Sequence, residues 1–165
     1  MMKNSRIREL RENEYDKLEE LLYEAIYQPD EDHPVSREVL KIPEVHAYIK
    51  DFGKRKDDYA LIAESDEHSM GGVWVRILSE EVKGYGNIDS ETPEFAISLF
   101  KEYRNKGIGT ALMKAMIGHL KEKKYRRASL NVKKENYAVN LYKKVGFKII
   151  GEDEQDYLML LELES

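Results

Sequence analysis

The sequence predicts an α/β domain with a mixed, mostly antiparallel sheet, one splayed parallel strand pair and about four flanking helices. First, the chain has 165 residues, of which 41% are hydrophobic and 36% charged, a balance typical of one soluble domain with a real core. Second, hydrophobic periods typical of helices and of strands alternate along the chain without a composition break. Third, the second half contains a strand, a helix and a strand whose lengths suit a right-handed parallel crossover. We therefore expect residues 1–165 to form a single domain.

The first half predicts a strand, two helices and a hairpin. Residues 6–10 alternate like a short strand, and Asn13 is a suitable N-cap for a helix with an apolar face. Pro43 can open a second helix, which Gly53 can close. Two further runs have the strand period and are joined by a polar turn: residues 59–64 and 72–78.

The second half predicts two strands and two helices in alternation, followed by a final strand pair. The helix from Ile108 to about Lys123 carries its apolar residues on one face. Gly146 is placed to end the following helix in a left-handed conformation. The expected elements are a strand at 95–100, a helix at 108–123, a strand at 128–132, a helix at 136–145, and strands near 147–151 and 157–163.

Composition excludes several classes of partner. The formal net charge is −5, and no five-residue window is uniformly basic, which argues against a duplex nucleic-acid partner. A basic patch formed only in the folded protein, around residues 121–124, Arg126 and Arg127, is the remaining route to nucleic acid. No apolar run approaches the ~20 residues of a membrane helix, and the N-terminus carries no signal peptide, so we expect no membrane partner and a cytoplasmic location.

Thiol and metal chemistry are also unfavoured. The chain contains no cysteine, which removes disulfides, thiolate metal ligands and cysteine nucleophiles. Its four histidines are scattered along the chain, so we expect no metal site. These histidines are His33, His46, His68 and His119.

A glycine-containing loop precedes the crossover helix. It has the sequence RNKGIGT from Arg104 to Thr110. Its two glycines let the backbone approach an anion closely, and the amides at the start of the helix lack acceptors where the helix dipole favours negative charge. The loop therefore suits a pyrophosphate, although an isolated G-x-G is also a common tight turn.

The loop and the segments after it resemble the GCN5-related N-acetyltransferase (GNAT) superfamily. The resemblance lies in R-x-x-G-x-G from Arg104, in Asn131 of the next strand, and in N-x-A-x-x-L-Y-x-x-x-G-F from Asn136 to Phe147. It is strongest from Glu94 to Phe147. It implies a GNAT-like sheet, acetyl-CoA as the cosubstrate and an acetyltransferase activity.

The resemblance also implies where the cosubstrate binds. The loop would wrap the pyrophosphate, and the strand at 95–100 would pair with the pantetheine arm after parting from its parallel neighbour near residue 98, with a bulge near Leu99. An amide of Leu99 or Phe100 would stabilise the oxyanion, and Asn136 would bond the arm or simply cap its helix. The full set of expected cofactor-binding residues is Leu99, Phe100, Arg104, Asn105, Lys106, Gly107, Ile108, Gly109, Thr110, Asn131 and Asn136.

Two residues are the candidate catalytic groups. Tyr142 is the expected general acid, because a phenol of pKa about 10 can give a proton to a departing thiolate; it could instead fill the core. Glu94 is the expected general base, and Asp89 is the second candidate. Alternatively, Glu94 is an ordinary acidic residue at the surface without a catalytic role. With no cysteine to carry an acyl group, direct attack in a ternary complex is expected.

The predicted function is therefore N-acetyl transfer from acetyl-CoA to a primary amine of a small molecule or peptide. A non-catalytic acyl-CoA-binding sensor or assembly module is the alternative. The acceptor cannot be read from the sequence. A strand near the C-terminus could form a sheet edge that pairs with a second copy, giving a homodimer.

Overall fold

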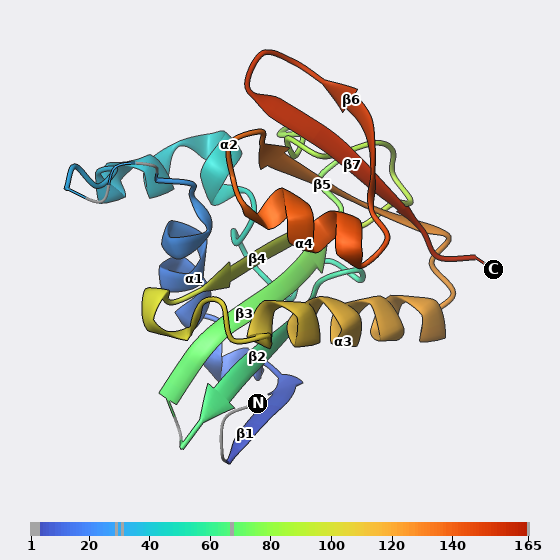
Figure 1. The fold of residues 1–165 in the computed structure, drawn as a ribbon. Helices are drawn as coiled ribbons and strands as arrows, with labels where there is room; N and C mark the ends of the chain where they lie inside the picture. The colour runs from blue at the N-terminus through green and yellow to red at the C-terminus, as the bar shows by residue number, and fades with distance from the viewer. Residues whose placement is uncertain (1–3, 29, 31, 67, 165) are drawn as a thin grey trace.

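The computed structural model describes residues 4–28, 30, 32–66 and 68–164. In this part of the chain, one seven-stranded sheet has the order β1-β2-β3-β4-β5-β7-β6 (Figure 1). Its β4–β5 pair is parallel and its other neighbours are antiparallel. The strands are β1 (Ser5–Glu9), β2 (Tyr59–Ser65), β3 (His68–Arg76), β4 (Glu94–Leu99), β5 (Arg127–Lys133), β6 (Lys148–Glu152) and β7 (Asp156–Glu162).

Helices cover both faces of this sheet. In Figure 1, α3 and α4 lie in front of the central strands, whereas α1 and α2 lie to their left. Each face has its own hydrophobic core, one built with α3 and α4 and the other with α1 and the segment around α2. The helices are α1 (Lys17–Ala25), α2 (Pro43–His46), α3 (Ile108–Glu122) and α4 (Ala138–Lys144).

Strand β3 shows how the sequence divides its residues between the two cores. Val73 and Val75 belong to the α3/α4 core, and Trp74 to the α1/α2 core, as strand alternation requires. Arg76 is on the same side as Trp74 and is buried in an ion pair with Asp58 (2.8 Å). A buried guanidinium needs such a partner, because an unpaired charge in the interior is costly.

Three predicted boundaries differ from the structure. The helix expected after Asn13 starts as a 3-10 turn at Glu12–Glu14, and α1 proper begins only at Lys17. The helix opened by Pro43 ends at His46, and turns continue to Gly53, whose φ of +96° is left-handed. Strand β3 begins at His68 rather than at residue 72, because pairing with β2 continues past a register shift between Ala63 and Glu64.

The parallel strands part earlier than predicted. The β4–β5 ladder consists of one bridge, Glu94 to Ser129, with the Ser129 amide donating to the Pro93 carbonyl (3.0 Å). The register of β3 with β4 is unbroken from Glu94 to Leu99, so the expected separation near residue 98 and the expected bulge near Leu99 are both wrong. A loop that contains Gly86 packs against β5 near this bridge. The Ser129 hydroxyl donates to the Gly86 carbonyl (2.7 Å), and a Cβ on Gly86 would lie only 2.9 Å from a β5 amide nitrogen.

Candidate active site

Strand β4 presents an open backbone edge toward β5. The Phe100 amide donates to the Met70 carbonyl (3.0 Å) on the β3 side. Because successive amides of a strand point in opposite directions, the Ile97 and Leu99 amides point toward β5, beyond the last bridge of that pair. The oxyanion role expected for the Phe100 amide is therefore wrong, since that amide is occupied. The same role for Leu99 stays a prediction.

The glycine-containing loop leads from β4 into α3. Gly107 has φ of +83°, and a Cβ there would meet no atom within 4 Å, so the backbone conformation rather than crowding requires glycine. The Ala111 amide donates to the Gly107 carbonyl (3.1 Å). The amides of residues 108–110 therefore precede the helical ladder and have no intrahelical acceptor. This is the arrangement of donors that an anion needs.

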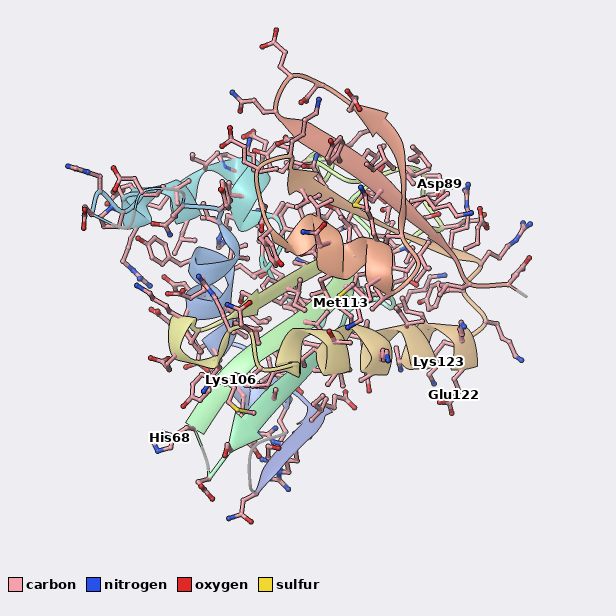
Figure 2. All side chains as sticks on the ribbon, in the orientation of Figure 1. His68, Asp89, Lys106, Met113, Glu122 and Lys123 are labelled. Atoms are coloured by element: carbon pink, nitrogen blue, oxygen red, sulfur yellow. The ribbon has the colours of Figure 1, made fainter. Side chains whose placement is uncertain are left out.

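Side chains fix the ends of this loop. The Arg104 Nε donates to the Leu99 carbonyl (3.0 Å), which ties the loop to the end of β4. Gly109 packs closely, because a Cβ there would lie 3.3 Å from Leu141 and 3.4 Å from Leu99. Lys106 is exposed at the start of α3, as Figure 2 shows. The loop thus offers backbone amides and a cation at one helix end, with Asn105 beside them in a left-handed conformation (φ +60°).

Glu94 lies at the single bridge between β4 and β5. It is 3% exposed. One carboxylate oxygen, Oε2, accepts hydrogen bonds from the Tyr48 hydroxyl and from the Gly86 amide (3.0 Å). The other, Oε1, is buried without a partner. Burial raises the pKa of Glu94 to about 7, against the smaller lowering effect of its two hydrogen bonds.

The loop of residues 84–86 covers this carboxylate. A Cβ on Gly84 would lie 2.0 Å from Glu94 Oε1, so only glycine allows the loop to approach this closely. The loop is held at its middle residue. The Tyr85 amide donates to the Tyr48 hydroxyl (2.8 Å), and the Asn131 side-chain amide donates to the Tyr85 carbonyl (3.3 Å).

Tyr142 lies on the opposite side of the sheet from Glu94. It projects from α4 into the α3/α4 core, where its ring contacts Phe147, which in turn contacts Phe95 (centroids 6.3 and 5.5 Å apart). Because Phe95 and Glu94 are consecutive in a strand, their side chains point to opposite faces. Burial alone raises the pKa of the Tyr142 phenol. The two candidate catalytic residues therefore lie on opposite faces of the sheet.

The remaining predicted residues have other partners. Asn136 Oδ1 accepts from the Ala138 amide (2.9 Å), so this residue caps α4 while its NH2 group stays available. Asn131 holds the loop of residues 84–86 on the Glu94 side. Asp89 is ion-paired with Arg127. Burial raises the pKa of Asp89, but hydrogen bonds from Glu91 and Thr92 and the Arg127 charge lower it overall, which disfavours Asp89 as the base.

Sequence reasoning missed Tyr48. It lies in the turns after α2, 46 residues from Glu94, and no motif marks it. Its only signal was its place in an apolar helical pattern, which is the ordinary signature of a core residue.

Alternative sites find little support in the described residues. They hold no group of three or more His, Cys, Asp or Glu residues placed for a metal ion. None of their helices is long and apolar enough to span a bilayer. Two cations of the basic cluster near the end of α3 are paired: Arg126 with Glu164 (3.1 Å) and Arg127 with Asp89.

An open strand edge beside a glycine-containing helix start defines a site for an extended cosubstrate with a phosphate group. Residues 10–147 match the model of the acetyltransferase (GNAT) family. The chain therefore belongs to that family, and it is an acetyl-CoA-dependent acetyltransferase. The family, fold class and enzyme class predicted from the sequence are confirmed.

Individual relatives agree with this assignment. An N-alpha-acetyltransferase of Sulfurisphaera tokodaii is 29% identical over 147 residues, covering 81% of this chain and 88% of its own. The PaiA N-acetyltransferase of Thermoplasma acidophilum, solved with coenzyme A, has a TM-score of 0.70 at 23% identity, covering 96% of this chain and 98% of its own. The acetyltransferase YncA of Salmonella typhimurium, solved with acetyl-CoA, has a TM-score of 0.64 at 17% identity, covering 98% and 95%. The two structures share the fold of this chain.

Proposed function

We propose that the protein transfers the acetyl group of acetyl-CoA to a primary amine by direct attack in a ternary complex. The observation that supports the proposal is that Glu94 and Tyr142 lie on opposite faces of a sheet whose strands β4 and β5 part after one bridge. Direct attack needs one group to take a proton from the amine and another to give a proton to the leaving sulfur. A parted sheet with an ionisable group on each face meets both needs.

The cosubstrate would lie along β4 and the start of α3. The amides of residues 108–110 and the Lys106 side chain would bind the pyrophosphate. Gly107 has no side chain to obstruct it. The free edge of β4 at Ile97 and Leu99 would pair with the pantetheine arm. The Asn136 NH2 group, left available by the capping bond of its oxygen, would donate to the same arm.

Glu94 would act on the acceptor amine. At neutral pH an amine is mostly protonated, so it must lose a proton before or during attack on the carbonyl. A carboxylate whose pKa is near 7 is matched to that task at physiological pH. Its oxygen Oε1 is buried under the loop of residues 84–86 and accepts no hydrogen bond from the described residues, so it would take the proton through a water as the new C–N bond forms.

Tyr142 would act on the leaving group. As the C–S bond breaks, its phenol would donate a proton to the departing thiolate, and the Leu99 amide would stabilise the negative charge on the carbonyl oxygen before that step. The high pKa of Tyr142 keeps the phenol protonated until it is needed.

For the acceptor, we propose a primary amine of a small molecule or peptide. The N-alpha-acetyltransferase of Sulfurisphaera tokodaii favours the α-amine of a peptide for the first assays. Peptides with varied first residues should therefore be compared with polyamines and amino acids of similar charge.

Thiol release from acetyl-CoA over this amine panel tests the proposal. Wild-type protein should release coenzyme A only with an accepted amine. Tyr142→Phe should lower kcat by about 10²-fold with coenzyme A affinity unchanged, because only the transferable proton is removed. Coenzyme A binding without thiol release over the whole panel would contradict transfer and favour an acyl-CoA sensor.

A further inference from the structure

A directed chain of hydrogen bonds ends on Glu94. The Tyr85 amide donates to the Tyr48 hydroxyl oxygen (2.8 Å), and the Tyr48 hydroxyl donates to Glu94 Oε2. A phenol has a single proton to donate. Because the Tyr85 amide occupies the hydroxyl oxygen, this proton is directed at the carboxylate.

The Tyr48 ring is itself held in place. The residue is 8% exposed, and its ring stacks on that of Tyr85 with centroids 6.4 Å apart and planes 11° apart. The indole nitrogen of Trp74 donates to the Tyr48 carbonyl (3.1 Å), which fixes the backbone from the side of β3. The hydroxyl therefore has little freedom to leave Glu94.

The two carboxylate oxygens of Glu94 therefore differ in their hydrogen bonding. Oε2 accepts two hydrogen bonds, from Tyr48 and from the Gly86 amide. Oε1 is fully buried and has none. Because Oε2 already accepts two hydrogen bonds, Oε1 is the carboxylate oxygen that can take a proton without displacing a donor of the described residues.

We propose that Tyr48 is a positioning residue, which holds Oε2 of Glu94 so that Oε1 alone takes the proton of the acceptor amine. The inference rests on the proposed role of Glu94 as general base. It adds a functional residue on the face of the sheet that carries Glu94. Tyr48 belongs neither to the loop of residues 104–110 nor to the family motif from Asn136 to Phe147.

The other polar groups packed around Glu94 are bound to other partners, so we assign the positioning role to Tyr48. From β3, Arg76 is the cross-strand partner of Glu94, but its guanidinium is bound to Asp58 and to the carbonyls of Ala47 and Lys50 (each 2.8 Å). From β5, the Ser129 hydroxyl donates to the Gly86 carbonyl. From the covering loop, Tyr85 presents its amide to Tyr48. In the described part of the chain, Tyr48 is the titratable side chain that is hydrogen-bonded to Glu94.

The test is the pH profile of kcat/KM for Tyr48→Phe, measured from pH 5 to 9 with acetyl-CoA and an accepted amine. Loss of the hydroxyl removes a hydrogen bond that lowers the pKa of Glu94. The acidic limb should therefore move to higher pH by about one unit. We expect kcat to fall about tenfold, with KM for acetyl-CoA unchanged.

Tyr125→Phe is the matched control. Its hydroxyl also donates to a carboxylate, that of Asp57, but this pair is not in contact with Glu94. The control should keep the wild-type pH profile.

The outcomes separate the inference from the proposed function. If Glu94→Gln is inactive while Tyr48→Phe keeps the wild-type limb and kcat, the positioning role is overturned and the base is not. If Glu94→Gln keeps wild-type activity, the base itself is overturned. Should Tyr48→Phe fail to fold, 3,5-difluorotyrosine at position 48 replaces it. This stronger donor should move the limb to lower pH, and an unmoved limb overturns the inference.

Discussion

Replacing Glu94 with glutamine should change how stability depends on pH. In the folded protein, burial raises the pKa of Glu94 from 4.5 to about 7. The folded state therefore binds more protons than the unfolded state between these values, and stability falls as pH rises through this window. The full shift corresponds to about 3 kcal/mol, most of which is lost between pH 5 and pH 8. Glutamine does not titrate, so this part of the slope should disappear.

Urea unfolding of both proteins at pH 5, 6, 7 and 8 measures this effect. The difference in unfolding free energy cancels the other titrating groups, which the two proteins share. It should shift by about 2–3 kcal/mol in favour of Glu94→Gln from pH 5 to pH 8. A difference that stays constant over this range would refute the reasoning, because it would mean that Glu94 titrates in the folded protein as it does in the unfolded chain.

Three further predictions follow from the geometry. Gly107→Ala should cost about 1–2 kcal/mol of stability, because alanine is strained at φ +83°, and should weaken coenzyme A binding in a calorimetric titration; unchanged affinity would contradict the anion site. Gly84→Ala would place a methyl group 2.0 Å from Glu94 Oε1 and should lower kcat at least tenfold. Its control, Gly118→Ala, has open space on α3 and should keep activity and gain about 0.5–1 kcal/mol. Arg76→Leu should lose about 3–5 kcal/mol in urea unfolding, because Asp58 would stay buried without its partner; a loss below 1 kcal/mol would contradict a buried ion pair.

Local patterns predicted the start of α3 and the end of α4 well. Helix α3 begins at Ile108 and Gly146 has a left-handed φ of +114°, as the apolar period and the glycine spacing indicated. These features depend on residues close together in the chain, where capping and periodicity act. The family motif from Arg104 onward lies in the same segments.

The surroundings of Glu94 could not be predicted, because their contacts join distant residues. The bond between Tyr48 and Glu94 depends on how the turns after α2 pack against β4, and no local pattern encodes that packing. Gly86 packs against β5 and Glu94 where β4 and β5 part, and its sequence context suggested only a loop. Which amide of β4 is free depends on the register with β3, so the choice between Leu99 and Phe100 needed the structure.

Backbone NMR of the ¹⁵N-labelled protein during a coenzyme A titration tests most directly whether the open edge and the start of α3 hold the cosubstrate. The account predicts that the amide signals of Leu99, Gly107, Ile108, Gly109 and Thr110 move together and saturate with one affinity, while the Phe100 amide, bonded to Met70, moves much less. Saturable binding with these five signals unmoved would contradict the placement. An unchanged spectrum at millimolar coenzyme A would contradict the site altogether.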